Sequence, residues 1–203
     1  MDKVLVFQPL CQNPLVEHPW LKELWRTDDL RQMFAESMEA FFDGTEQDCS
    51  GQVLLIGYAN PNADKLLPIG ITGYWHLDDS CDVLGMRWTG ISKERSGGNM
   101  LSQVAYSLLS GVFPLGRFLV EVTQTPEVVA QYLKSGFVPL EEVDDLIEFA
   151  DLSRGNLLRS AGINQDNGET ILVYDVCRYS GFKSKYKTVL LTESREPYKN
   201  TRR

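Results

Sequence analysis

Hydrophobic and polar positions along the chain follow two periods, and each period predicts a different kind of element. A weakly alternating segment at 3–7 predicts a short first strand. Two helices are expected next, at 19–26 and 27–42, the second capped by Thr27 and followed by Gly44. One face of the second helix carries an apolar stripe made of Leu30, Met33, Phe34, Met38 and Phe41. We expect that stripe to pack in a core.

The middle of the chain alternates more strongly and predicts strands in close order, at 52–59, 69–77 and 82–91. Turn residues separate these strands, so we expect an antiparallel meander. A helical stripe then runs from Leu101 to Val112. It is followed by a strand at 117–123 and by a helix at 125–135 that ends at Gly136.

The last quarter of the chain has a weaker pattern. We expect an exposed acidic segment at 141–151, a helical turn at 156–161, and strands at 168–177 and 188–191. Three consecutive strands in the middle of the chain exclude a simple doubly wound sheet. The order of elements favours an α/β fold with a mixed sheet and a strand–helix–strand crossover in its second half.

A short glycine-rich segment lies between the strand that ends near Ile91 and the helix that follows. Its sequence runs from Arg95 through Ser96, Gly97, Gly98 and Asn99 to Met100. Backbone N–H groups at such a helix start, with the helix dipole behind them, can hold the phosphates of a ligand. The alternative from the residues alone is a plain turn before a helix.

The strand and helix that follow this segment carry a resemblance to a known family. Val120-Glu121-Val122, followed by the segment from Ala130 to Phe137 (AQYLKSGF), resembles the L-E-V…L-Y-x-K-x-G-F segment of the GNAT acyl-CoA-dependent N-acyltransferases. Arg95-x-x-Gly98 is similar to the R/Q-x-x-G-x-G/A pyrophosphate loop of that family. The resemblance extends over residues 1–140, and its specific motifs lie between Ile91 and Phe137.

The resemblance implies a mixed, mostly antiparallel central sheet, flanked by helices and splayed between its fourth and fifth strands, with acetyl-CoA as co-substrate. Gly90 and Ile91 would pair with the pantetheine arm, and a bulge is expected at Gly90. The amides from Ser96 to Met100 would hold the pyrophosphate. Met100 replaces a small family residue, which predicts crowding at the phosphates, and Thr125 replaces an Asn.

The resemblance also gives roles to two residues. Tyr132 stands where family members place the tyrosine that protonates the leaving thiolate, and Glu121 matches a strand carboxylate that could act as the general base. The alternatives are a Tyr132 that packs on an apolar face with Val129 and Leu133, and a solvated Glu121. Asp82, His76 and Arg87 are further polar residues on nearby strands.

Composition restricts the classes of function. The 203 residues carry a net charge of −8, which argues against a nucleic-acid partner. Four scattered cysteines and two histidines offer little for a metal site, and no metal is expected. No apolar run suits a membrane span, so we expect a cytoplasmic protein. We expect one domain over residues 1–203, with a basic C-terminal extension at 180–203.

Three functional hypotheses remain at this point. The leading one is an acetyltransferase that acts on an amine, either a small molecule or a protein, with a homodimer left open. The second is an enzyme like the acyl-homoserine-lactone synthases, because residues 73–77 and Arg87-Trp88 are similar to strand motifs of those enzymes. However, those enzymes carry an Arg where His76 stands. The third is a GNAT fold without catalysis that serves as a binding protein.

Overall fold

A computed structural model describes residues 4–45, 51–59, 66–77, 82–98, 100–143, 153–161, 163, 165–179 and 186–191. Within these residues, eight strands form one mixed sheet in the order β6-β7-β5-β4-β3-β2-β1-β8. The strands are β1 (Val4–Pro9), β2 (Gln52–Ala59), β3 (Leu66–His76), β4 (Val83–Ile91), β5 (Phe118–Thr123), β6 (Val138–Pro139), β7 (Thr170–Asp175) and β8 (Lys187–Leu190). The α-helices are α1 (Asp28–Phe42), α2 (Lys93–Ser96), α3 (Leu101–Ser107), α4 (Pro126–Lys134) and α6 (Arg154–Ser160). Shorter turns of helix are η1 (Pro19–Leu24), η2 (Leu108–Val112), η3 (Leu140–Glu142) and η4 (Val176–Tyr179).

The strand connections follow from where helices interrupt the chain. Strands β1 to β4 pair antiparallel in sequence order, which confirms the expected meander. Strand β5 pairs parallel with β4 because α2, α3 and η2 carry the chain back across the sheet, as expected for a crossover. Strand β7 then pairs antiparallel with β5, and β8 pairs parallel with β1.

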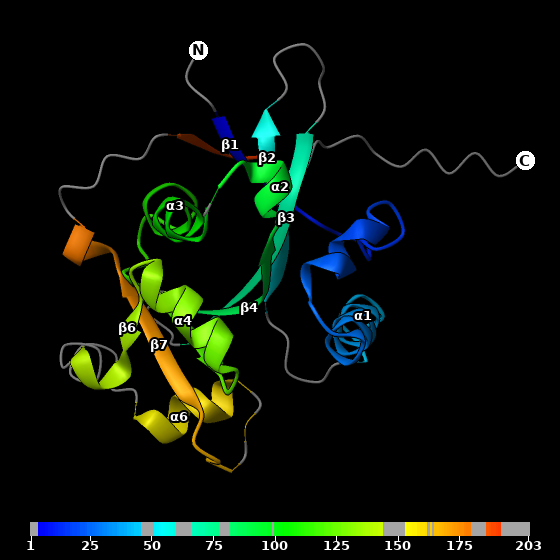
Figure 1. Cartoon of the computed structure of the whole chain (residues 1–203). Helices are drawn as coiled ribbons and strands as arrows, with labels where there is room; N and C mark the ends of the chain where they lie inside the picture. The colour runs from blue at the N-terminus through cyan, green and yellow to red at the C-terminus, as the bar shows by residue number, and fades with distance from the viewer. Residues whose placement is uncertain are drawn as a thin grey trace, which may run out of the picture.

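The helices cover both faces of the sheet (Figure 1). Helix α1 lies on one face, and α3 and α4 lie on the other. On the α1 face, Phe34 and Met38 pack against Leu21 of η1 and against strand residues Val53, Leu55 and Ile71. On the opposite face, the stripe from Leu101 to Val112 is buried as expected.

Two apolar residues that the sequence analysis placed on apolar helix faces, Met33 of α1 and Leu133 of α4, face solvent instead. Met33 is 62% exposed and Leu133 is 42% exposed. Successive residues on a helix are about 100° apart, so each of these side chains is rotated away from the buried Phe34 and Tyr132 that it neighbours in sequence. The expectation that Met33 packs in a core was wrong, and Leu133 does not share the buried face of Tyr132 that the alternative for Tyr132 described.

Strands β4 and β5 are paired at one end only. Their parallel ladder joins Val83, Leu84 and Gly85 to Phe118, Leu119 and Val120, and both strands continue beyond it. The sheet is therefore splayed between β4 and β5, as the resemblance implied. From Met86 to Ile91, β4 has no strand partner on this side within the described residues.

A β-bulge lies on β4 next to the splay. Ile71 pairs with Gly90 and Gly73 pairs with Arg87, so Thr72 alone faces the two residues Trp88 and Thr89. Trp88 has a φ of 49°, in the left-handed region that favours glycine. The bulge was expected at Gly90. It lies just before that residue, at Trp88 and Thr89.

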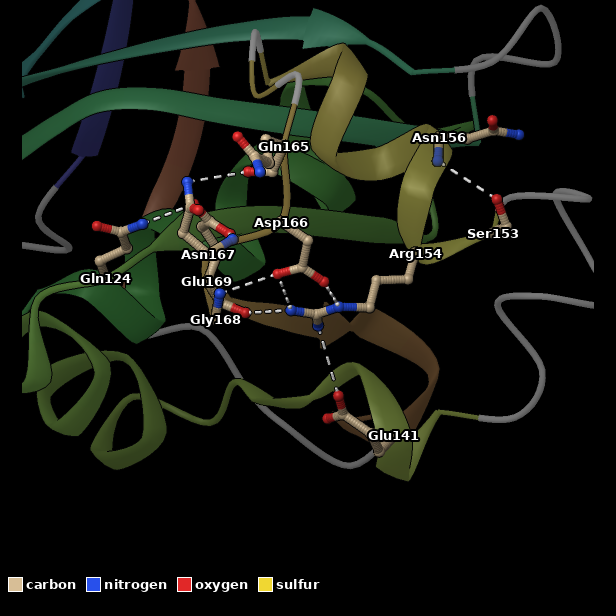
Figure 2. A network of polar contacts seen from close by, with 10 residues as sticks. All are labelled: Gln124, Glu141, Ser153, Arg154, Asn156, Gln165, Asp166, Asn167, Gly168 and Glu169. Atoms are coloured by element: carbon tan, nitrogen blue, oxygen red, sulfur yellow. Dashed lines mark hydrogen bonds and ion pairs between the residues drawn. The ribbon is translucent and has the colours of Figure 1, made fainter.

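A polar network joins α6 to the ends of β5 and β7 (Figure 2). Ser153 caps α6, and Arg154 donates to the Asp166 carboxylate and to the Glu169 carbonyl. The buried Glu169 accepts from Gln124, which directly precedes the N-cap of α4. The network thus holds the turn from which α4 starts. The sequence indicated only a turn at 156–161 here.

Two predicted features fall partly or wholly outside the described residues. Most of the acidic segment at 141–151 lies outside them, although Leu140 and Val143 on either side of its start are buried. Strand β8 belongs to the segment expected to be a C-terminal extension, and it forms an edge of the sheet. None of the helices in the described part of the chain has the length and apolar character that a bilayer crossing requires.

Candidate active site in the strand splay

The splay holds a cluster of polar side chains from three elements. Glu121 is the first residue of β5 beyond the part that pairs with β4, and the Tyr132 side chain reaches it from α4. The Tyr132 phenol donates to Oε2 of Glu121 at 3.3 Å. The Thr89 hydroxyl, from the bulge of β4, lowers the pKa of the phenol. The predicted acid and the predicted base therefore form one hydrogen-bonded pair.

Tyr132 is held in place by the packing of α4. The helix begins at Pro126, whose ring suits a first helical position, and it ends before Gly136, which has a φ of 96°. The Tyr132 residue is only 5% exposed, and its ring meets Phe137 edge to face with centroids 4.8 Å apart. Val128 and Val129 pack against the core cluster to which Tyr132 belongs. The phenol is therefore directed into the splay.

The surroundings of the pair change the proton affinity of both groups. Burial raises the pKa of the Glu121 carboxyl to about 8, and the hydrogen bond from Tyr132 offsets part of that rise. Burial and the neighbouring Glu121 raise the pKa of the Tyr132 phenol well above its ordinary value, and the Thr89 hydrogen bond acts in the opposite direction. A carboxyl that changes charge near pH 8 is suited to proton transfer.

The expected phosphate loop is one helical turn followed by glycines. Ser92 caps α2, and Gly97 ends it in the left-handed conformation with a φ of 77°. The Ser96 hydroxyl donates to the Gly98 carbonyl at 2.8 Å, and Tyr58 donates to the Ser96 carbonyl at 3.2 Å. A Cβ added at Gly97 or Gly98 would have no atom within 4 Å. The outer side of this turn is thus open to a ligand.

The remaining loop residues take different positions. The Arg95 guanidinium lies 3.8 Å from the ring centroid of Trp20 and thereby joins α2 to η1. Met100 is 5% exposed and its side chain lies in the core with Leu101 and Val104. The Met100 side chain is therefore directed into the core, and crowding of the phosphates stays a prediction. Asn99 lies outside the described residues.

Gly90 and Ile91 lie on the part of β4 that has left β5. A Cβ at Gly90 would come within 3.0–3.2 Å of Leu24 and Trp25, which lie over the strand. Glycine therefore allows this close approach, and the bulge does not depend on it. The Ile91 side chain packs against the core, and Ile91 lies beyond the part of β4 that pairs with β5. This edge offers peptide groups to an extended ligand.

Thr125 and the other polar candidates lie apart from the pair. Thr125 is the N-cap of α4, and its side chain makes no capping hydrogen bond. His76 is exposed at the end of β3, and Arg87 stacks over the Trp88 ring at 4.2 Å. Asp82 precedes the paired end of β4, where its carbonyl accepts from Arg117. Glu121 is thus the carboxylate that the fold brings to Tyr132.

Sequence reasoning missed the two threonines behind the pair. The hydroxyls of Thr72 and Thr89 are 2.8 Å apart, and Thr72 is fully buried. Regular alternation from Met86, which faces away from α1, would have put Thr89 on the α1 face, and nothing in the residue types marks a bulge at a tryptophan. In the described part of the chain, no group of three or more His, Cys, Asp or Glu side chains is placed to hold a metal ion.

Comparisons with known proteins support the fold. No protein-family model matches the chain, and no curated protein sequence matches it. The structure is similar to that of AAC(6')-Ib in complex with paromomycin and acetyl-CoA, with a TM-score of 0.52 and 11% identity over 89% of this chain and 98% of that one. It is also similar to a chimera of spermidine N-acetyltransferase SpeG from Vibrio cholerae and hSSAT, with a TM-score of 0.50 and 14% identity over 88% and 99% of the two chains. The fold is therefore GNAT-like.

Proposed function

We propose that this protein is an acyl-CoA-dependent N-acetyltransferase that transfers an acetyl group from acetyl-CoA to a small-molecule amine. The observation that carries the proposal is the Tyr132–Glu121 pair, at 3.3 Å, at the point where β4 and β5 part. An acid and a base in contact, in a splay edged by unpaired backbone, suit a reaction that moves one proton off the nucleophile and one onto the leaving group. Structural neighbours that bind acetyl-CoA or act on amines support the same class.

The splay and the turn after α2 would bind different parts of acyl-CoA. The edge of β4 at Gly90 and Ile91 would pair with the amides of the pantetheine arm, as a strand pairs with an extended peptide. The open turn at Gly97 and Gly98, followed by the start of α3, would hold the pyrophosphate with backbone N–H groups. Arg95, held over Trp20, adds a positive charge beside that turn.

The reaction is direct acyl transfer. The neutral amine nitrogen attacks the thioester carbon, the C–N bond forms, and the C–S bond breaks. The ionised Glu121 carboxylate takes the proton that the nitrogen loses. The Tyr132 phenol gives its proton to the departing thiolate sulfur. Since the two groups are hydrogen-bonded, the proton held by Glu121 can return to Tyr132 and restore the pair.

The test is a search for turnover with the full chain. Acetyl-CoA is incubated with a panel of polyamines, aminoglycosides and aryl- and alkylamines, and release of free thiol is followed from pH 6 to 9.5. Acetylated product, identified by mass spectrometry, supports the proposal. If calorimetry shows that CoA binds but no amine of the panel is acetylated, the proposed enzyme is contradicted and the protein is a binding protein.

The site assignment has a separate test. Gly98→Glu places a carboxylate in the open space of the turn, so we expect CoA affinity to fall at least tenfold. Gly155→Glu on α6 is the matched control, because it adds the same charge far along the chain, with the nearest atom 3.5 Å from the new Cβ. Equal CoA affinity in both variants would remove the pyrophosphate from this turn.

A further inference from the structure

Helix α4, which carries Tyr132, lies beside strand β7 (Figure 1), and polar contacts hold both ends of the helix to segments that flank this strand. Just before the helix, the Gln124 amide donates to the Glu169 carboxylate at 2.6 Å, and Glu169 directly precedes β7. Just after the helix, the Gly136 carbonyl accepts from the Tyr179 hydroxyl at 2.6 Å, and Tyr179 lies in η4, which directly follows β7. The segments at the two ends of β7 therefore fix the two ends of α4.

The contact between Tyr179 and Gly136 is close and well supported. Gly136 has a φ of 96°, and a Cβ added there would collide with the Tyr179 hydroxyl, so both the backbone and the packing require glycine. The Tyr179 ring stacks on Tyr174, with centroids 4.8 Å apart and ring planes 4° apart. Burial raises the pKa of the Tyr179 phenol, so the hydroxyl keeps the hydrogen that it donates throughout the neutral range.

The Gly136 end of α4 holds both the main chain and the ring of Tyr132. The Tyr132 carbonyl accepts from the N–H groups of Ser135 and Phe137, at 2.9 and 3.2 Å, on either side of Gly136. The Tyr132 ring meets Phe137 edge to face, and Phe137 in turn lies against the Tyr174 ring. A displacement of the Gly136 carbonyl would therefore move the main chain and the ring of Tyr132 together.

The segment η4 is itself fixed to β5, the strand that carries Glu121. Arg117 directly precedes β5, and its guanidinium donates to both oxygens of Asp175, the last residue of β7. The Asp175 carboxylate also accepts from the Cys177 N–H at 2.9 Å. The Val176 N–H donates to the Arg117 carbonyl at 3.1 Å. The contact from η4 to α4 therefore sets the position of α4 relative to β5.

We propose that Tyr179 is a positioning residue for Tyr132, because its hydrogen bond to the Gly136 carbonyl holds α4 where the Tyr132 phenol can donate to Glu121. This inference rests on the proposed acyl transfer. The phenol oxygen and Oε2 of Glu121 are 3.3 Å apart, which is already long for a hydrogen bond between oxygens, so a small outward shift of α4 would separate them. The phenol would then neither lower the pKa of Glu121 nor recover the proton from it.

The kinetic test removes a single hydroxyl. Tyr179→Phe keeps the stacked ring and loses only the donor, so kcat should fall about fivefold while the KM for acetyl-CoA stays within about twofold. The acidic limb of the pH–rate profile should move to higher pH, because the hydrogen bond that lowers the pKa of Glu121 is weakened. In a Tyr132→Phe background, Tyr179→Phe should change neither kcat nor the limb, because the group on which it acts is absent. Tyr74→Phe is the matched control, because it removes a phenol hydrogen bond of 2.7 Å to Gln52, between β3 and β2.

A purely structural role would give a different pattern. Tyr179→Phe and Tyr74→Phe each lose one hydrogen bond, so both should lower the urea midpoint, but only Tyr179→Phe should move the acidic limb. If Tyr179→Phe keeps the wild-type kcat, or lowers kcat without moving the limb, the positioning role is wrong. It is also wrong if Tyr179→Phe lowers kcat equally with Tyr132 present and absent, or if Tyr74→Phe moves the limb as far.

A second measurement does not depend on turnover. Fluorotyrosine is incorporated in place of the eight tyrosines, and the ¹⁹F signal of Tyr132 is assigned by its loss in Tyr132→Phe. This signal should titrate as Glu121 ionises, with a midpoint at about pH 8, and the midpoint should move to higher pH in Tyr179→Phe but not in Tyr74→Phe. An unmoved midpoint in Tyr179→Phe overturns the inference. A moved midpoint in a protein that acetylates no amine would support the positioning contact while the proposed function fails, so the two failures are distinguishable.

Discussion

A buried carboxylate lies at each end of the contact between β4 and β5, and the two carboxylates have different hydrogen-bond donors. At the paired end, Arg117 donates from Nε and Nη2 to the two oxygens of Asp175, at 3.2 and 3.1 Å. Asp175 also accepts from the Cys177 N–H and is 4% exposed. At the splayed end, the partner that donates to Glu121 is the neutral phenol of Tyr132.

The difference between the two ends shows how one strand can combine rigidity with proton transfer. A guanidinium beside a buried carboxylate compensates its charge and fixes the geometry. A carboxylate beside a neutral hydroxyl is left with the cost of burial, so its charge follows the pH of the solution. The paired end therefore stabilises the fold, and the splayed end supplies a group with an adjustable charge.

The largest expected effect is a loss of stability at the paired end. Arg117→Met leaves the Asp175 carboxylate buried without its cation, which typically costs about 3 kcal/mol of the free energy of unfolding. Urea denaturation at pH 7 measures this loss. Arg159→Met, which removes an exposed guanidinium, is the control and should change stability by less than about 0.5 kcal/mol. Similar midpoints for the two variants would contradict the comparison.

The next effect concerns the splayed end. Glu121→Gln should lower kcat about 100-fold or more, because general-base catalysis contributes on this scale. The base acts when ionised, so the wild-type rate should rise with pH up to about 8, the pKa of Glu121, and then level off. The variant should lose this acidic limb and keep its affinity for acetyl-CoA. A limb unchanged in position and slope would exclude Glu121 as the base.

A smaller effect separates the two members of the pair. Tyr132→Phe should lower kcat about tenfold or more and leave cofactor affinity unchanged, because only the hydroxyl is lost. The phenol hydrogen bond lowers the pKa of Glu121, so its removal should move the acidic limb to higher pH. Tyr186→Phe controls for the chemical change. Wild-type turnover in Tyr132→Phe would make Tyr132 a packing residue.

The smallest effect lies in the network that supports α4. Arg154→Met should lower the urea midpoint less than Arg117→Met, because Arg154 and Asp166 are both partly exposed. The Arg154 guanidinium holds the pKa of Asp166 below its ordinary value. Such a contribution is complete above the unfolded pKa near 4 and is lost as the pH falls below it. The stability difference from wild type should therefore shrink between pH 4 and pH 2, and a constant difference would contradict this account.

Periodicity predicted the elements that bury one continuous face. Helix α1, the meander, β5 and α4 begin and end within a few residues of their expected bounds. The splay and the fold class were also predicted, although through the family resemblance and not through hydropathy. Tyr132 and Glu121 were predicted as a site for the same reason, and their contact was not foreseen because a strand residue and a helix residue meet only through the tertiary fold.

The parts that sequence reasoning missed depend on packing between distant segments. The bulge at Trp88 depends on contacts with Ser37, Phe41 and Gly73, none of which is a neighbour in sequence. Thr89 and Thr72 lie opposite each other at that bulge, with their hydroxyls 2.8 Å apart. Met33 and Leu133 are exposed because each lies at the margin of the apolar face of its helix. The periodicity of the sequence does not resolve how far each helix is rotated about its axis.

The pairing of β8 with β1 has a consequence for the order in which the molecule folds. These two strands are the first and the last in the described chain, and they form the most distant pairing in the sheet. During synthesis, β1 and the meander emerge long before β8, so one edge of β1 stays unpaired until residues 187–190 have been synthesised. Pairings of such sequence separation close slowly, and an unpaired edge can recruit another chain. Nascent chains stalled before residue 187 should therefore associate more readily than the completed protein.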